Sequence, residues 1–218
     1  DEQCKITYGS EYSYNASTQI CEKHVHSGGG SGNGGNSGGG EGSSIFKDVS
    51  VNHKNWDAIV YLHGAGVFEG YGDGSFKPDQ TVNRAELLKI IIEGKGLTPN
   101  EDMFKECFDD VAGEWFAKYV CYAKSEGWVE GYNDGKLFKP TQKVSNAESI
   151  KMLLEGSGVE VEDVEEKPFD DVEIDVWFAP YVQAARKLQI LEEKGSLFGP
   201  NKDKSRAAIA ENLYRLVK

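Results

Sequence analysis

One motif occurs three times in this chain at nearly equal spacing, and this repetition limits the possible folds more than any other feature. It reads Phe-Lys-Asp-Val at 46–49 and Phe-Asp-Asp-Val at 108–111 and 169–172, so the copies start 62 and 61 residues apart. Each copy is followed by a tryptophan, a stretch with helical character, a turn and a Phe-x-Pro motif. A unit of this length buries too little apolar surface to fold alone. We therefore expect the three copies to share one core.

Each unit is predicted to fold as helix, turn, helix, which makes the chain mainly α. The second helix of the first unit has Leu87, Leu88, Ile91 and Ile92 at helical spacing. The segments Asn-Arg-Ala-Glu at 83–86 and Ser-Asn-Ala-Glu at 145–148 both fit a capping box, whereas the third copy keeps only the serine. The predicted helix-capping residues are Asn83, Glu86, Ser145, Glu148 and Ser205.

Composition divides the rest of the chain. Residues 1–26 contain two cysteines and short alternating segments, which predict a small disulfide-closed module resembling a β-hairpin. Residues 27–44 contain glycine, serine and asparagine with one glutamate, which is typical of a flexible linker. We place the three repeats at 45–102, 103–164 and 165–218.

The four cysteines suggest two local disulfides. None of them forms a C-x-x-C motif, so the spacing typical of zinc sites is absent from the sequence. We predict that Cys4 pairs with Cys21 and that Cys107 pairs with Cys121, in an oxidising compartment. The alternative is four free thiols in a cytosolic protein. The first residue is Asp1, so either a signal peptide has been removed or the sequence is a fragment.

Charge and motifs exclude several function classes. The chain has 36 acidic and 24 basic residues and a formal net charge of -12, which argues against nucleic-acid binding. No run of 18 apolar residues is present, so we expect no membrane span. Nucleophile-elbow, P-loop and H-E-x-x-H motifs are also absent from the sequence. We therefore expect a protein that is not an enzyme and that needs neither a cofactor nor a metal.

Arg84 is the residue whose presence capping does not explain. It occupies the first position of a predicted helix, where the positive end of the helix dipole disfavours a cation. An arginine beside free helix N–H groups makes a good anion site. The alternative is an arginine that pairs with a nearby carboxylate in this acidic chain. Arg206 holds the same position in the third repeat, and Asn146 holds it in the second.

The run GYGDGSFKPDQTVNRAE at 70–86, preceded by Phe-Lys-Asp-Val and a tryptophan, resembles the S-layer homology (SLH) domain, whose hallmark ends in a motif like T-R-A-E. The resemblance covers residues 45–218. It implies a pseudo-threefold helical bundle with three prongs, on the outside of a bacterial cell. It also implies grooves between repeats that bind an anionic secondary cell-wall polysaccharide, often one carrying pyruvate ketals.

The resemblance also implies site residues. The anion-binding arginines would be Arg84 and Arg206, with Asn146 at the third position. The aromatic groove walls would be Trp56, Trp115 and Trp177, although these tryptophans could equally be core anchors at helix starts. Asn146 carries no charge, so we expect the second groove to lack its cation. The turn of the third repeat is two residues shorter than that of the second, so we expect a smaller contribution from Arg206.

Two functions fit these features. The first is a non-catalytic cell-surface module that binds the wall polysaccharide and anchors a protein to the bacterial envelope. The second is a structural subunit that assembles with copies of itself into a surface layer or an extracellular filament. In the second function the N-terminal segment would pair with a neighbouring subunit.

Overall fold

The computed structural model describes residues 12–15, 20–23, 44–191 and 196–218 of the chain. This part contains six helices and two small antiparallel sheets, which confirms a mainly α fold. Strands β1 (Tyr12–Asn15) and β2 (Ile20–Lys23) pair with each other near the N-terminus. Cys4, with its predicted disulfide, and the predicted linker before Ser44 lie outside the described residues.

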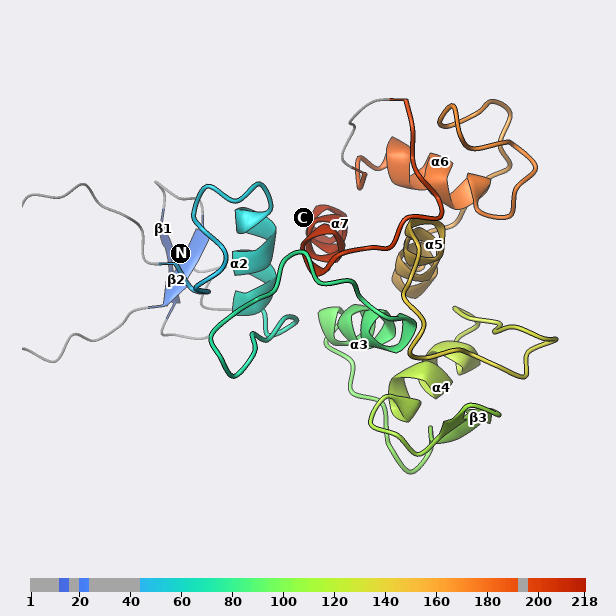
Figure 1. The fold of residues 1–218 in the computed structure, drawn as a ribbon, viewed down its shortest axis with the longest axis horizontal. Coiled ribbons are helices and arrows are strands. Elements are labelled where there is room, and N and C mark those ends of the chain that lie inside the picture. Colours follow the sequence, from blue (N-terminus) through green and yellow to red (C-terminus); the bar gives the residue numbers. More distant parts are fainter. Residues whose placement is uncertain (1–11, 16–19, 24–43, 192–195) are drawn as a thin grey trace, which may run out of the picture.

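Each repeat contributes two helices. Their bounds are α2 (Trp56–Gly64) and α3 (Arg84–Gly94), α4 (Ala117–Ser125) and α5 (Asn146–Ser157), and α6 (Ala179–Lys187) and α7 (Arg206–Val217). The second repeat also contains strands β3 (Glu106–Phe108) and β4 (Val111–Ala112). The second helices, α3, α5 and α7, lie at the centre, and the first helices lie around them (Figure 1). Among the described residues, no helix has the length and apolar content that crossing a membrane requires.

Each outer helix packs mainly on the central helix of another repeat. Helix α4 packs on α3 and α6 packs on α5, so each outer helix covers the central helix of the preceding repeat. Helix α2, from the first repeat, packs on α7 at the end of the chain. The first and last repeats are therefore joined in the same way as consecutive repeats.

A cycle of backbone hydrogen bonds joins the repeats where the central helices begin. Val82 N donates to Lys204 O at 3.0 Å, Lys204 N donates to Val144 O at 3.0 Å, and Val144 N donates to Val82 O at 2.9 Å. Each central helix also donates its first amide to the next repeat, from Arg84 to Gln142 O, from Asn146 to Lys202 O and from Arg206 to Gln80 O. These bonds satisfy helix N–H groups that have no partner within the helix.

The aspartate of the repeated Phe-x-Asp-Val motif holds the Phe-x-Pro turn of its own repeat. The Asp48 carboxylate accepts the amide hydrogens of Phe76 and Lys77, both at 2.8 Å. The equivalent carboxylates accept the same two amides in the other repeats, Asp110 from 138 and 139 and Asp171 from 198 and 199. The Phe-x-Asp-Val and Phe-x-Pro motifs recur together because the aspartate of the first holds the backbone of the second.

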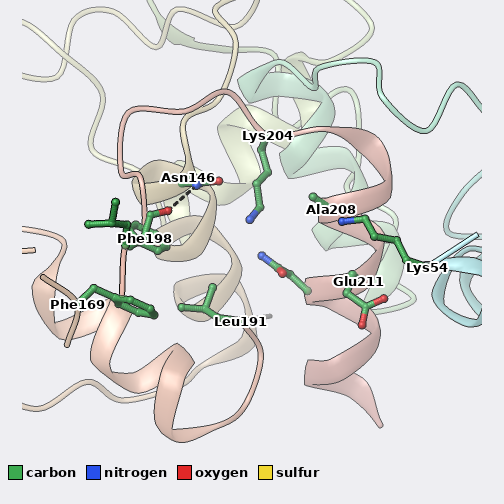
Figure 2. A pocket seen from close by; sticks show the side chains of 10 residues that line it. Lys54, Asn146, Phe169, Leu191, Phe198, Lys204, Ala208 and Glu211 are labelled. Carbon is green, nitrogen blue, oxygen red and sulfur yellow. Dashed lines mark hydrogen bonds between the residues drawn. The ribbon is translucent and has the colours of Figure 1, made fainter. Parts of the chain in front are cut away.

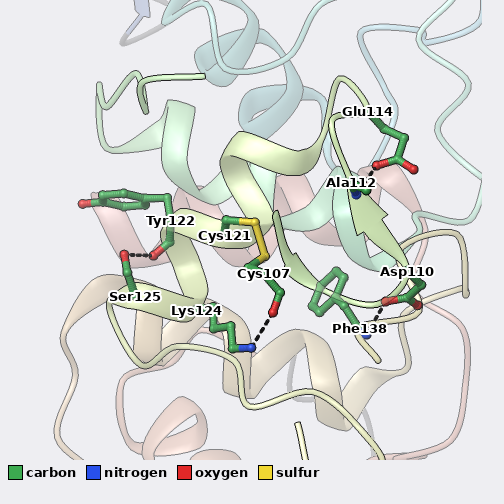
Figure 3. Close-up of a disulfide and its surroundings, with 9 residues drawn as sticks. All are labelled: Cys107, Asp110, Ala112, Glu114, Cys121, Tyr122, Lys124, Ser125 and Phe138. Atoms are coloured by element: carbon green, nitrogen blue, oxygen red, sulfur yellow. Dashed lines mark hydrogen bonds between the residues drawn. A yellow bond between two sulfur atoms is a disulfide. The ribbon is translucent and has the colours of Figure 1, made fainter. Parts of the chain in front are cut away.

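The predicted Cys107–Cys121 disulfide is confirmed. It connects β3 to α4, with 5.4 Å between the two Cα atoms (Figure 3). Beside it, Lys124 Nζ donates to Cys107 O and lies over the Phe108 ring. The bond gives the second repeat a covalent link between its hairpin and its outer helix.

Gly156 provides a test of the close packing between central helices. A Cβ atom at this position in α5 would lie 2.6 Å from Ile91 Cγ2 on α3 and 3.3 Å from the Trp128 ring. We predict that Gly156→Ala lowers the free energy of unfolding, because overpacking costs about 1–3 kcal/mol and exceeds the gain in helix propensity. Urea denaturation measures this change.

Gly64→Ala is the matched control. Gly64 ends α2, and nothing lies within 4 Å of the position that its Cβ would take. We expect this variant to be as stable as the parent or slightly more stable. A Gly156→Ala variant that is equally stable would show that the central helices are not tightly packed at this point.

Candidate functional site

Aromatic and charged side chains around Arg84 line a groove of 390 Å³, here called the Arg84 groove. All three repeats contribute to it, since Arg84 begins α3 of the first, Tyr132 and Glu148 belong to the second, and Trp177 and Tyr181 belong to the third. The other residues that line it are Trp128, Val129, Glu130, Gly131, Lys151 and Met152. A groove built from three repeats forms only when the repeats pack together.

Arg84 is buried at the base of this groove, with only 5% of its surface exposed. Its Nε donates to Phe138 O at 2.9 Å, and its Nη1 donates to Glu148 Oε1 at 2.8 Å. The guanidinium also lies over the rings of Tyr132 and Phe138. Its Nη2 has no acceptor among the described residues. The structure therefore gives Arg84 the carboxylate partner that the sequence left as an alternative.

The carboxylate of Glu148 is held ionised. Burial by itself would raise its pKa, but a hydrogen bond from the Tyr132 hydroxyl, hydrogen bonds from Ser145 and the charge of Arg84 together lower it. Burial and the bond to Glu148 raise the pKa of Tyr132. Arg84, Glu148 and Tyr132 therefore form one hydrogen-bonded group that fixes the base of the groove.

The opposite wall of the groove is exposed and aromatic. The Trp177 indole is 55% exposed, and Tyr181 lies one helical turn further on in α6. Lys151 Nζ lies 5.9 Å from the centre of the Trp177 ring and 5.8 Å from that of Tyr181. Its ion pair with the exposed Glu130, at 3.5 Å, is of the kind that contributes little energy. The ion pair with Glu130 therefore holds the amino group of Lys151 only weakly.

The same residue types stand at the positions equivalent to those of the Arg84 groove when Arg206 takes the place of Arg84, and this set is here called the Arg206 site. The equivalent residues are Arg206, Tyr71, Glu86, Lys89, Trp115 and Tyr119. Arg206 Nε donates to Phe76 O at 3.0 Å, as Arg84 does to Phe138 O. The Tyr119 hydroxyl donates to Glu93, as that of Tyr181 donates to Glu155. The chain therefore carries two sets of matched side chains.

Arg206 differs from Arg84 in its partners. It is half-buried, and its Nη2 donates to Glu69 O at 3.0 Å. No carboxylate among the described residues lies within ion-pair distance of it. Burial lowers the pKa of Arg206, and the nearby charges of Tyr71, Glu86 and Asp48 offset this only in part. Arg206 is thus the less neutralised of the two arginines.

The third position, here called the Asn146 pocket, has other residue types and a volume of only 160 Å³ (Figure 2). Asn146 Nδ2 donates to the carbonyl oxygens of Phe198 and Gly199, which replaces the bond made by the arginine Nε elsewhere. Ala208 stands where the other sites have glutamate, Glu211 where they have lysine, and Lys54 where they have tryptophan. The groove features of the other two positions are lost here.

The structure changes three of the expectations from sequence. Trp56 begins α2 and is partly buried against the core, so it is not equivalent to Trp115 and Trp177, which precede their helices by two residues and are exposed. Arg206 packs against the intact turn of the first repeat, so the shortened turn of its own repeat does not weaken its surroundings. The Asn146 pocket does not lack cations, since Lys54 and Lys204 line it.

The capping residues have the predicted positions. Asn83 and Ser145 accept the amide hydrogens of Glu86 and Glu148, and each glutamate accepts the amide hydrogen of its cap. Ser205 accepts the amide hydrogen of Ala208. Glu148 therefore has two roles, since the carboxylate that completes a capping box also pairs with Arg84.

Sequence reasoning missed Lys89, Lys151, Tyr119 and Tyr181. A signal for them exists: each lysine lies three residues after the capping-box glutamate, and each tyrosine lies four residues after an exposed tryptophan. Only the packing of α6 on α5 shows that Lys151 and Tyr181 line one groove, and the packing of α4 on α3 brings Tyr119 and Lys89 onto neighbouring helices in the same way.

Comparison with known proteins confirms that the chain contains three repeats of one domain type. The sequence profile of the S-layer homology domain matches residues 45–88, 108–148 and 168–210. The chain is similar to a cellulosome-anchoring protein of Acetivibrio thermocellus, with 31% identity over 62% of this chain and 31% of that protein. It is similar to a surface layer protein of Brevibacillus choshinensis, with 36% identity over 47% of this chain and 9% of that protein.

An exoglucanase of Acetivibrio thermocellus is 30% identical over 80% of this chain. The match covers 16% of that enzyme. The chain therefore spans less than a third of the length of each of these relatives.

We predict that Arg84→Met destabilises the protein more than Arg206→Met. Removing Arg84 leaves Glu148 without its ion-pair partner in a site where its side chain is 16% exposed. Loss of one partner of a buried pair costs about 3 kcal/mol, whereas loss of hydrogen bonds to two carbonyls costs about 1–2 kcal/mol. Urea denaturation of both variants measures the difference. Equal losses would show that the ion pair contributes no more than the carbonyl contacts.

The lowered pKa of Glu148 predicts a dependence of stability on acid. Its ionised form favours the folded state, so its contribution is complete above the ordinary pKa of glutamate, near 4.3, and is lost as the pH falls through the lower folded value. Between pH 6 and pH 3, the free energy of unfolding should fall less steeply for Glu148→Gln than for the parent. The difference in slope is at most about 1.4 kcal/mol per pH unit for one proton. Parallel curves would contradict the lowered pKa.

Proposed function

We propose, from the fact that this chain belongs to the S-layer homology domain family, that its repeats bind an anionic secondary cell-wall polysaccharide. Through this binding they would hold the protein that contains them at the surface of a bacterial cell, without catalysing a reaction. One observation carries the proposal: an exposed tryptophan and a half-buried tyrosine lie with a lysine and an arginine in the Arg84 groove, and the same residue types stand at the equivalent positions of the Arg206 site.

The chemistry of these side chains suits a charged sugar. An exposed indole offers a flat apolar surface on which one face of a sugar ring can pack, while hydroxyl groups remain in water. An acidic substituent, such as a pyruvate ketal, needs a cation within reach. Lys151 and the Nη2 group of Arg84 supply it in the Arg84 groove. Arg206 supplies it in the other site, together with Lys89, whose amino group also pairs with Glu93 at 2.6 Å.

The relatives support the surface location. Two of them are named as an anchoring protein and a surface layer protein. The exoglucanase is an enzyme, but most of its length lies outside the match, which agrees with a separate, non-catalytic role for this part. A protein with such a role outside the cell is also consistent with the disulfide of the second repeat.

We infer that the three repeats form the pseudo-threefold bundle with prongs that the resemblance implies. The equivalent hydrogen bonds among Val82, Val144 and Lys204 and the exchange of outer helices between repeats support this inference. The fold matters for function because it brings each arginine next to the turn of another repeat.

The test compares Trp177→Ala with Trp56→Ala. We expect Trp177→Ala to weaken binding to purified secondary cell-wall polysaccharide of Acetivibrio thermocellus about tenfold, because one stacking contact is worth about 1–1.5 kcal/mol. Trp56→Ala should lower the melting temperature and leave the affinity of the folded protein unchanged. Isothermal titration calorimetry and melting curves measure the two effects.

Two further measurements decide between the functions. Polysaccharide from which pyruvate has been removed by mild acid should bind more weakly if the cations recognise that group. Sedimentation of the protein alone, without cell walls, tests self-assembly into a layer or filament. No binding to the polysaccharide, together with concentration-dependent assembly, would replace anchoring with the structural role.

A further inference from the structure

The Cys107–Cys121 disulfide closes the segment that carries the aromatic residues of the Arg206 site. Trp115 and Tyr119 both lie between the two cysteines. One end of the closed segment is anchored in β3 and the other is anchored in α4 (Figure 3). Any motion of this segment therefore moves both side chains.

The third repeat builds the same wall without a cross-link. The positions equivalent to the two cysteines are Pro168 and Gln183. The bond from Arg186 to Pro168 O takes the place of that from Lys124 to Cys107 O, so the polar contact is common to both repeats. Among the described residues, the second repeat differs from the third here in having the disulfide and the β3–β4 hairpin.

The start of the outer helix differs between the two repeats. Helix α6 has Pro180 in its first turn, where the ring fixes φ and favours the helical conformation. Helix α4 has Lys118 at the equivalent position, and neither helix has a side-chain cap or an acidic residue in its first turn. Helix α4 therefore lacks the proline that helps to fix the start of α6.

The packing around Trp115 gives little additional support. The indole is 56% exposed, and its ring contacts are with Phe116 and Tyr119, which belong to the same closed segment. The rest of the segment is anchored to the protein by the disulfide, by the buried side chains of Val111 and Val120, and by the packing of α4 on α3. The bond from Tyr119 to Glu93 and the ion pair between Lys118 and Glu101 add to this anchoring, but none of these contacts involves the Trp115 indole.

We propose that the Cys107–Cys121 disulfide is a positioning element of the Arg206 site. It holds Trp115 and Tyr119 in the arrangement that Pro180 helps to give Trp177 and Tyr181 in the Arg84 groove. This inference rests on the proposed function for its effect on binding. Under this proposal, the affinity of the Arg206 site depends on the disulfide, whereas the affinity of the Arg84 groove does not.

Reduction of the bond has a defined consequence. An external dithiol transfers two electrons and two protons to the two sulfur atoms, which become thiols, while the dithiol closes to its own disulfide. The segment that carries Trp115 then loses its covalent closure, and the Arg206 site weakens. The Arg84 groove contains no cysteine and keeps its affinity.

The first experiment needs no ligand. Amide hydrogen exchange is measured on the full chain and on Cys107→Ala/Cys121→Ala, well below the melting temperature of either protein. Residues 109–118 should exchange about tenfold faster in the variant, while the equivalent residues 170–180 exchange at the parent rate. Unchanged exchange at 109–118 overturns the proposal. Equal acceleration in both segments also overturns it, because the disulfide would then stabilise the whole protein.

The second experiment isolates each site. Trp177→Ala removes a wall of the Arg84 groove, and Trp115→Ala removes the equivalent wall of the Arg206 site. In the Trp177→Ala background, the double cysteine variant should bind purified secondary cell-wall polysaccharide of Acetivibrio thermocellus about tenfold more weakly. In the Trp115→Ala background its affinity should stay within about twofold. Treating each single tryptophan variant with dithiothreitol should give the same two results.

The outcomes separate the two proposals. Equal losses in both backgrounds, or no loss in the Trp177→Ala background, contradict the positioning role. If the parent protein does not bind the polysaccharide, the proposed function fails, and the hydrogen-exchange result alone decides whether the disulfide positions Trp115.

Discussion

The cycle of hydrogen bonds among Val82, Val144 and Lys204 is the constraint on which the other features depend. Each bond joins one repeat to another, and the cycle closes only when the third repeat returns to the first. The central helices begin beside it, so their first amides find acceptors on the neighbouring repeat. The outer helices then pack on the central helix of the preceding repeat, and the site residues are brought together as a result.

This closure explains how the repeats could diverge without loss of the fold. Asn146 keeps the hydrogen bond to the Phe198 carbonyl that an arginine would make, so the structure there survives while the charge is lost. Arg84 supplies both a hydrogen bond between repeats and a charge, since it donates to a carbonyl of the next repeat and pairs with Glu148. Substitution of Arg84 is therefore expected to affect stability as well as binding, whereas Trp177 can change with less effect on the core.

Much of the fold follows from the sequence, because local rules determine it. The repeat spacing indicates three units, and the capping-box motifs at 83–86 and 145–148 indicate where two of the central helices begin. The Cys107–Cys121 pair was correctly predicted from proximity in the chain. The site was harder, because its residues come from three repeats. Trp56 was grouped with the other tryptophans by its order in the repeat, yet Lys54 holds the equivalent position. Only the packing between repeats reveals this difference.

The most direct test of ring closure is hydrogen exchange of the three amides in the cycle, measured in increasing denaturant. If the repeats form one closed ring, the amides of Val82, Val144 and Lys204 should exchange only through global unfolding and show the same free energy of opening. If the third repeat merely rests against the first, Val82 should exchange through a smaller opening while Val144 stays protected. That result would contradict a closed ring and the shared sites that depend on it.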